Sequence, residues 1–491
     1  MSAVLLGLLI HMPMLVQDIP NHDGLDSMHF DQNMITSGRW FLTVACGISS
    51  YYTIPWLIGL LAMIYLGLAS AVLVDFLEVK GMAAIVLISG LLVSFPSLAS
   101  TFAYVFTMDG YMLALFLAIL AVWLTKRKRL GFVAGAVCLA FSLGIYQAYL
   151  PFAVLLCIYG ILMIAMDKGE LKDKLLQGLH YLYMGIFGVA GYFVILQILL
   201  KVQGKEMSSY HGGNSAGTMG LAELLETVKK MYTDFFAFTL KGNVLINNGF
   251  SLLVLVLLVL LTAGVLLKLA AEKRWWKGPW LYILLLFLIF SLPVSTNIML
   301  LISPEVTYHA LMRYQWVLYP ILMVAFITGY GEKLQGSSVW EWGILVTAGV
   351  LIWNFVVTDQ IAYSNLQKKY EKTYAYCVRL LDRIEQTEGY YQGIPIAMIG
   401  VVGEESYPET DITGAVTSNL IGMNSDGLLY TGSNYELFMK HYLGATLNIL
   451  PPEAMAEMYY SPEYREMESF PAKDSIRIID GVMYIKTENK E

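Results

Sequence analysis

The chain has 491 residues, of which 57% are hydrophobic and 14% are charged, and its formal net charge is −7. An average soluble domain carries roughly 25% charged residues, so this composition excludes a single water-soluble core. Residues 359–491 hold 20 acidic and 11 basic side chains, and an acidic segment of this kind argues against a nucleic-acid partner. The cysteines, which lack metal-ligand spacing and are interpreted as packing residues, are Cys46, Cys138, Cys157 and Cys377.

Apolar runs long enough to cross a bilayer recur along the first two thirds of the chain. They lie near residues 3–17, 54–74, 82–98, 109–125, 130–147, 151–166, 178–200, 248–268, 279–301, 314–331 and 341–358. We therefore expect a polytopic α-helical membrane protein with about eleven transmembrane helices. The first run is short and lacks the features of a signal peptide, which indicates either a thin, tilted span or a chain that starts further upstream.

Basic side chains occur in every second connection between these runs. They lie at Lys80, 126–129, 168–174, 268–277 and Lys333. Because basic loops stay in the cytoplasm, we expect a multi-pass protein of the cell membrane with a cytoplasmic N-terminus. The outer connections are then 18–53, 99–108, a tight bend at Tyr146–Gln147, 201–247, 302–313 and the tail.

Two amphipathic helices are expected in the outer loops. Residues Leu221–Leu240 place apolar side chains at helical spacing opposite charged ones, which suits a helix in the outer interface or one packed on the spans. A second such helix is expected over Gly38–Ile48, with Ser37 as its cap.

The chain is predicted to divide into a transmembrane domain, residues 1–358, and a small extracytoplasmic α/β domain, residues 359–491. Within the second domain, Asn365–Thr387 has helical spacing, Pro395–Gly403 is strand-like and residues 434–444 are helix-like. Asp480–Gly481 is typical of a hairpin turn. No phosphate loop or nucleophile elbow is recognisable in this domain, which favours a docking or specificity role.

The first outer loop concentrates ionisable side chains beside the membrane. They are Asp18, His22, Asp23, Asp26, His29, Asp31 and Arg39. A carboxylate at the membrane boundary can accept a proton from a sugar hydroxyl, and partial burial tunes a carboxylate for that role. A solvated acidic loop would explain the same residues without chemistry.

Asp109 begins the fourth predicted span and is flanked by Tyr104 and Tyr111. A carboxylate there must be hydrated or paired, because a charge inside lipid costs several kcal/mol. It could orient an acceptor or assist a general base. Equally, it could do no more than complement the dipole of its helix.

Arg313 lies where an outer loop meets a span, with Glu305 and His309 nearby. A guanidinium at that depth can neutralise a phosphate at the level of the lipid headgroups, and Arg39 could do the same from the first loop. Either arginine could instead be an interfacial anchor whose charged end reaches toward water.

The order of these motifs resembles that of the GtrII-type membrane glucosyltransferases of the GT-C class. The resemblance rests on Asn21-His22-Asp23 with Ser37-Gly38-Arg39-Trp40, Phe102-Ala103-Tyr104 with Asp109 and Tyr111, the segment Gly144–Tyr149, and the closing segment Phe470–Thr487. It extends over nearly the whole chain.

The resemblance implies inverting transfer of a hexose, typically glucose, from a polyprenyl phosphate donor to a cell-surface glycan on the extracytoplasmic face. It implies as partners a synthase that loads the lipid and a small flippase. Asp23 would be the general base, Asp109 would assist it, and Arg39 and Arg313 would hold the donor phosphate. The other expected substrate-binding residues are His22, Asp26, Asp31, Tyr104, Tyr111, Tyr146, Gln147 and His309.

Two departures from the family pattern bear on these roles. The first span lacks a basic flank, and the acidic pair expected of many GT-C enzymes is not adjacent here, so the choice of Asp23 over Asp26 or Asp31 is a judgement. No cofactor is assigned, and a divalent metal stays open. The competing functions are a polytopic lipid-linked-sugar transporter or flippase and a non-catalytic scaffold for envelope assembly.

Overall fold

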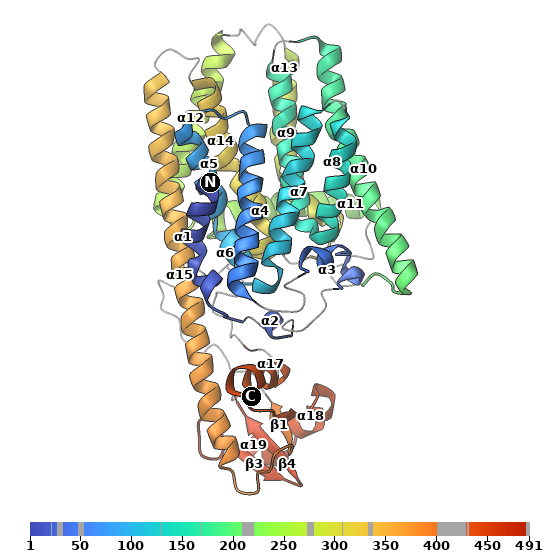
Figure 1. The fold of residues 1–491 in the computed structure, drawn as a ribbon, viewed down its shortest axis with the longest axis vertical. Helices are drawn as coiled ribbons and strands as arrows, with labels where there is room; N and C mark the ends of the chain where they lie inside the picture. Colours follow the sequence, from blue (N-terminus) through green and yellow to red (C-terminus); the bar gives the residue numbers. More distant parts are fainter. Residues whose placement is uncertain are drawn as a thin grey trace.

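The computed structural model describes residues 1–20, 22–26, 33–47, 54–128, 130–167, 169–208, 220–272, 279–306, 308–331, 337–399, 429 and 432–487. Figure 1 shows a bundle of steep helices above a small unit that contains the sheet. The bundle helices are α1 (Ser2–Val16), α4 (Pro55–Phe76), α5 (Met82–Ser94), α6 (Pro96–Phe102), α7 (Met108–Arg127), α8 (Gly131–Ile145), α9 (Leu150–Met166), α10 (Leu171–Gln203), α12 (Gly249–Glu272), α13 (Pro279–Thr296), α14 (Leu318–Gly331) and α15 (Ser337–Glu385).

Every predicted apolar run coincides with one of these helices or with the bent pair α5 and α6. Within the described residues, seven helices are long and apolar enough to cross a membrane, and the pair, bent by 49°, would make an eighth span. The bend falls at Phe95, where the following Pro96 disfavours helical backbone. Three further apolar helices are shorter, so the number of eleven spans stays a prediction.

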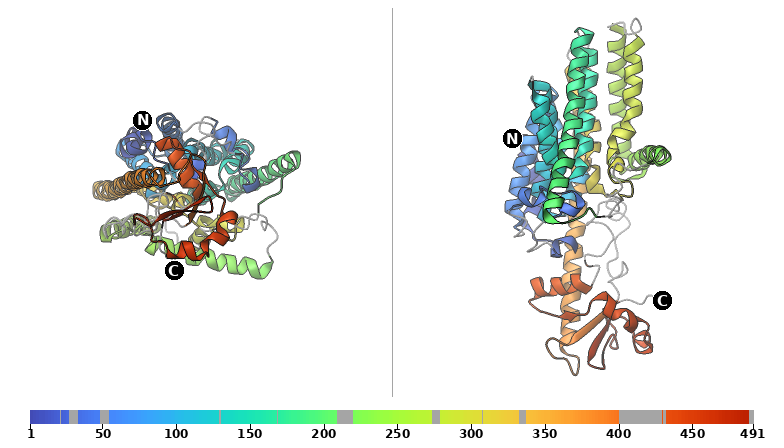
Figure 2. Two further views of the ribbon diagram at one scale, coloured as in Figure 1. Left: turned by 90° about the horizontal axis from the view of Figure 1, so that it is seen from below. Right: turned by 90° about the vertical axis from the view of Figure 1, so that its right-hand side faces the viewer.

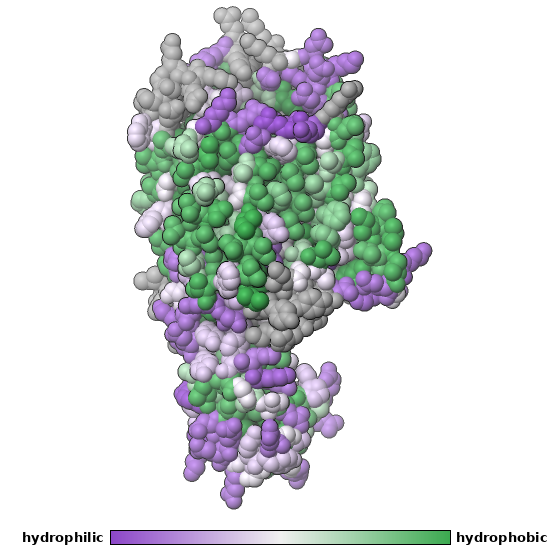
Figure 3. Space-filling model, viewed as in Figure 1, coloured by the Kyte–Doolittle hydropathy of each residue, from purple (hydrophilic) through white to green (hydrophobic). Residues whose placement is uncertain are grey.

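The centre of the bundle is formed by α7, which packs against α4 and α8. The apolar part of α7 is 72% buried inside the protein, whereas that of α10 is 22% buried. Peripheral helices therefore present apolar side chains outward, and Figure 3 shows the resulting hydrophobic belt across the face of the bundle in view. A belt of this kind matches the hydrocarbon of a bilayer.

The long helix α15 links the bundle to the sheet-containing unit. It runs for 49 residues without interruption, so the expected boundary at residue 358 falls inside a helix, and Asn365–Thr387 continues that helix instead of starting a new one. No glycine or proline occurs between residues 350 and 385, and nothing in the local sequence ends the helix. Figure 2 shows α15 extending from the bundle into the unit below.

The unit below the bundle contains a four-stranded sheet of order β2-β1-β4-β3. The strands are β1 (Pro395–Ile399), β2 (Asn448–Ile449), β3 (Ile476–Ile479) and β4 (Val482–Lys486). β1 runs parallel to β2 and β4, and β3 and β4 form the hairpin predicted at Asp480–Gly481. The helices α17 (Gly432–Phe438), α18 (Pro452–Tyr459) and α19 (Pro462–Glu466) accompany the sheet. Residues 400–403 of the strand predicted over Pro395–Gly403 lie outside the described residues.

Of the two helices expected in the outer loops, one is confirmed and the other is wrong. The first is confirmed as α11 (Leu221–Lys241), which lies across the bundle axis (Figures 1 and 2). The second, over Gly38–Ile48, is wrong: a 3-10 turn, η1 (Ile35–Ser37), precedes a left-handed Gly38, and only Leu42–Ala45 forms a helix, α3. The Ser37 hydroxyl donates to the carbonyl of Met34 and caps nothing.

Candidate functional site

The short helices η1 and α3 lie at one end of the bundle together with α2 (His22–Asp26), and the sheet-containing unit follows below them, whereas α11 crosses the bundle further from this end (Figure 1). This is the end that the charge pattern predicts to face outward. Arg39 and Tyr111, two of the predicted site residues, contact each other there.

Arg39 lies against two stacked tyrosines at this end. The rings of Tyr111 and Tyr146 are parallel within 3°, with centroids 4.2 Å apart. The guanidinium carbon of Arg39 is 4.8 Å from the centroid of Tyr146, and its Nη1 donates to the Tyr111 hydroxyl at 3.3 Å. Cation–π and hydrogen-bond contacts thus hold the guanidinium in one orientation. We call Arg39, Tyr111 and Tyr146 the arginine–tyrosine site.

The bend after α8 explains why Tyr146 lies there. Tyr146 adopts extended backbone (φ −155°, ψ 113°) and is followed by a single 3-10 turn, η3 (Gln147–Tyr149), before α9 begins at Leu150. The tight turn predicted at Tyr146–Gln147 is therefore confirmed. It directs the Tyr146 ring onto Tyr111, in the first turn of α7.

Two motifs that carry the family resemblance contact each other around this bend. Gln147 Nε2 donates to the carbonyl of Ser37 at 3.0 Å and to the hydroxyl of Tyr192 at 2.9 Å. The amide of Phe41 donates to the carbonyl of Gly144 at 2.7 Å. A Cβ at Gly144 would lie 2.5 Å from the ring of Trp40, so only glycine allows this close approach. The segment around Arg39 is thus fixed on the α8–α9 connection.

Asp109 lies in the first turn of α7, two residues before Tyr111. It is 2% exposed, and its Oδ1 accepts a hydrogen bond from the amide of Gly110 at 2.8 Å. A carboxylate at this position also complements the positive end of the helix dipole. Tyr104 lies just before the 3-10 turn η2 (Val105–Thr107) that leads into α7.

Asp23 is exposed on α2. Like the arginine–tyrosine site, α2 lies at the lower end of the bundle in Figure 1, so Asp23 and that site share one end of the protein. Asp31 and the side chains of His22 and Asp26 lie outside the described residues, so their predicted roles are not tested.

The sheet-containing unit contacts the first loop beside α2. Helix α17 packs on α2, and the hydroxyl of Tyr442, one turn beyond α17, donates to Oδ2 of Asp18 at 3.4 Å. Although part of Asp18 is exposed, the surrounding protein raises the pKa of its carboxyl by excluding water, and the Tyr442 hydrogen bond opposes that rise. The unit therefore covers part of the loop that carries Asp23.

Arg313 has a different environment from Arg39. It lies in the 3-10 segment η7 (Ala310–Val317), is 7% exposed and donates to both carboxylate oxygens of Asp234 on α11, at 2.7 and 2.8 Å. Its guanidinium also lies 4.3 Å from the ring centroid of Phe238 and 4.6 Å from that of Tyr308. A bidentate pair of this kind fixes α11 to the bundle. His309 immediately precedes this segment.

Two buried ionisable residues were missed by the sequence reasoning. His11 on α1 is within 2.5 Å of the Tyr363 hydroxyl and within 2.7 Å of the Val93 carbonyl. Asp359 on α15 is 0% exposed, and neither carboxylate oxygen has a hydrogen-bond partner among the described residues. His11 lies within the apolar run 3–17 and Asp359 directly follows the run 341–358, and the hydropathy of such segments hides single polar positions. Within the described ranges, no group of three or more His, Cys, Asp or Glu residues is arranged to hold a metal ion.

The helices and the hydrophobic belt define an integral membrane protein, and three of its predicted site residues, Arg39, Tyr111 and Tyr146, contact one another at one end of the bundle. Residues 12–329 match the family model described as glucosyl transferase GtrII. The chain therefore belongs to this family of glucosyltransferases, as the motif order indicated. The matched region contains every predicted site residue and stops before α15. No curated protein and no solved structure matches the chain.

Proposed function

We propose that the protein transfers glucose from a polyprenyl phosphate donor to a glycan acceptor at the extracytoplasmic face of the cell membrane. One observation carries the proposal: an oriented cation, Arg39, and a nearby exposed carboxylate, Asp23, lie at the same end of a membrane bundle. Displacement of a lipid phosphate requires a cation for the leaving group and a base for the nucleophile. In the proposal, Arg39 is the cation and Asp23 is the base.

Arg39 binds the donor phosphate in this proposal. Its Nη1 bonds to Tyr111 and its face lies on Tyr146, which leaves a guanidinium already oriented when the donor arrives. Such pre-orientation lowers the entropy lost on binding. Arg313 is a weaker candidate for this role, because a phosphate would have to displace Asp234. We assign Arg313 the role of positioning α11.

Asp23 accepts the proton of the acceptor hydroxyl. The hydroxyl oxygen forms a bond to the anomeric carbon while the bond from that carbon to the phosphate oxygen breaks. The polyprenyl phosphate leaves with the electron pair, and the proton ends on Asp23. A single displacement of this kind inverts the anomeric configuration. Asp109 supports the site from the first turn of α7.

The two predicted partner proteins, the synthase and the flippase, would act in the steps that precede this reaction. A synthase must attach the sugar to the lipid, and a flippase must bring the loaded lipid to the outer face. The unit that follows α15 is proposed to contribute to acceptor binding, because α17 covers α2 beside Asp23. No metal or organic cofactor is assigned to the reaction.

The test uses purified protein in lipid vesicles with polyprenyl-phosphate glucose and candidate glycan acceptors. We expect polyprenyl phosphate to be released only when an acceptor is present, in equal amount to the glucose transferred, with inverted configuration. If the donor stays intact with every acceptor while the protein moves it across the bilayer, the transferase proposal is wrong and the protein is a transporter.

A further inference from the structure

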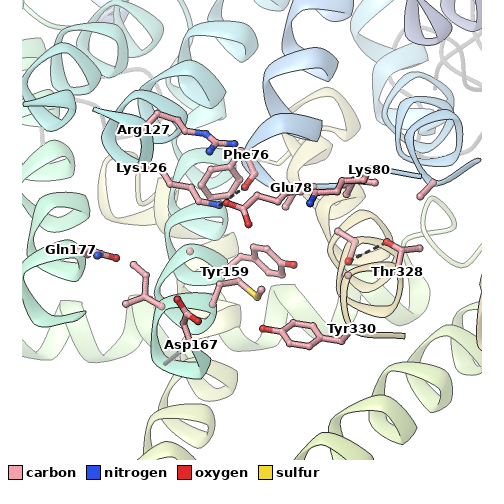
Figure 4. Close-up of a pocket in the computed structure, with 18 of the residues that line it drawn as sticks. Phe76, Glu78, Lys80, Lys126, Arg127, Tyr159, Asp167, Gln177, Thr328 and Tyr330 are labelled. Carbon is pink, nitrogen blue, oxygen red and sulfur yellow. Dashed lines mark hydrogen bonds and ion pairs between the residues drawn. The ribbon is translucent and has the colours of Figure 1, made fainter. Parts of the chain in front are cut away.

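A large pocket opens at the other end of the bundle, away from the arginine–tyrosine site. Its volume is about 1100 Å³, which is enough for a lipid headgroup and part of a chain. It lies between the ends of α4, α7, α9 and α14 and the first turns of α5 and α10. Figure 4 shows side chains from these elements around the space. We call it the basic pocket.

Positive charge predominates in its lining. The cationic residues are Lys80, Lys126, Arg127, Lys128 and Lys174, and the acidic residues are Glu78, Asp167 and Asp173. Lys126 lies 3.0 Å from Glu78, and Arg127 lies 3.0 Å from Asp75, so these charges are largely balanced. Lys80 and Lys128 are exposed and form no ion pair with any residue that the structure describes. The rim therefore presents two cations that an anion could bind.

The deeper wall is apolar and carries two phenol groups. Tyr159, which is 7% exposed, and Tyr330 lie beyond Glu78 and Lys126 in Figure 4. Gly160, Met163 and Leu345 contribute apolar surface beside them. A cationic rim above an apolar wall is complementary to a molecule with an anionic head and a hydrocarbon chain.

The position of the pocket adds a third observation. It lies where the spanning helices α4 and α7 end, at the basic residues that follow their apolar segments. Lipid headgroups lie at this level of a bilayer. An anionic lipid of the adjoining leaflet could thus enter the pocket without leaving the membrane.

We propose that the basic pocket binds the phosphate headgroup of an anionic membrane lipid, with Lys80 and Lys128 on the phosphate and the chain along the wall of Met163 and Leu345. The proposal concerns a site separate from the transferase site and does not depend on the reaction.

The test measures lipid binding to the full-length protein in detergent by native mass spectrometry. Phosphatidylglycerol is the probe, phosphatidylcholine is the zwitterionic comparison, and inorganic phosphate is the competitor. We expect Lys80→Gln/Lys128→Gln to weaken phosphatidylglycerol binding about 30-fold, because each of the two lysines contributes about 1 kcal/mol near an anionic headgroup and about 1.4 kcal/mol corresponds to a tenfold change. The matched control, Lys368→Gln/Lys440→Gln, removes the same charge from exposed positions outside the bundle and should bind as the unaltered protein does.

A second variant tests the space itself. Ala83 is an exposed residue of the lining, so Ala83→Trp should fill the entrance without disturbing the core and should reduce phosphatidylglycerol binding by a similar factor. The proposal is overturned if either pocket variant binds like the unaltered protein or if the control loses as much. It is also overturned if phosphatidylcholine binds equally tightly, or if millimolar phosphate displaces the lipid, which would indicate a site for free anions.

Discussion

Arg39 and Tyr146 form a cation–π pair, with the guanidinium carbon 4.8 Å from the ring centroid. The two residues come from separate motifs that the fold brings together at one end of the bundle. Tyr146 in turn stacks on Tyr111, so the orientation of Arg39 depends on the α8–α9 bend. The stacked tyrosines therefore determine the direction in which the Arg39 guanidinium faces in the proposed donor site.

Replacing Tyr146 with leucine should weaken donor binding. The cation–π contact contributes about 0.5–2 kcal/mol, so KM for polyprenyl-phosphate glucose should rise by about 2- to 30-fold. Phe141→Leu is the control, because Phe141 packs on Trp40 and Phe41 and not on Arg39. Steady-state kinetics of both variants measure the effect, and equal KM values would remove Tyr146 from donor binding.

Gly144→Ala should destabilise the protein through the ring of Trp40. The added Cβ would lie 2.5 to 2.9 Å from three ring atoms, and overpacking of this kind costs about 1–3 kcal/mol. Gly178→Ala is the control, because a Cβ there meets nothing within 4 Å. Thermal unfolding in detergent should show a lower melting temperature for Gly144→Ala alone. Unchanged melting of both variants would contradict the contact.

The Arg313–Asp234 pair should hold α11 on the bundle. Removing Arg313 leaves a partly buried carboxylate without its cation, so Arg313→Met should cost about 3 kcal/mol of the free energy of unfolding. A double-mutant cycle with Asp234→Asn measures the coupling. We expect the double variant to be less destabilised than the sum of the single ones. Additive losses would mean that the two residues act independently.

The carboxyl of Asp18 should make stability depend on pH. Its pKa is raised by exclusion of water, so the folded protein binds the proton more tightly than the unfolded chain does. Ionisation therefore costs stability, which falls as pH rises from the usual aspartate range through the raised pKa. Asp18→Asn should melt at a higher temperature than the unaltered protein at neutral pH, and the difference should vanish in acid. A constant difference across pH would contradict this environment.

Local sequence patterns predicted most elements of the fold but not all of their limits. Each apolar run formed a helix, and the hairpin at Asp480–Gly481 formed as expected. The join between the last span and the tail was missed, because α15 changes from apolar to amphipathic without any residue that breaks a helix. The helix expected over Gly38–Ile48 failed because contacts from Gln147 and Gly144 hold that segment in turns.

The same distinction applies to the site. Arg39 and Tyr146 were each identified as candidates from their motifs, but they contact each other from positions 39 and 146 of the chain, and no local pattern reveals a contact between residues so far apart in sequence. In the sequence, Asp234 is only one of several charged residues on the polar face of α11, and nothing there identifies it as the partner of Arg313. The burial of His11, within an apolar run, and of Asp359, directly after one, was not predicted, because burial of a single polar residue depends on neighbours from other helices.

The most direct measurement for the proposed reaction compares Asp23→Asn with Asp173→Asn in single-turnover release of polyprenyl phosphate. Asp173 is an exposed carboxylate at the far end of the bundle, so its variant should turn over at the normal rate. A general base contributes about 10²–10⁴-fold, and Asp23→Asn should lose at least 100-fold while its melting temperature stays unchanged. Full activity of Asp23→Asn would contradict the proposed role of Asp23 as the base.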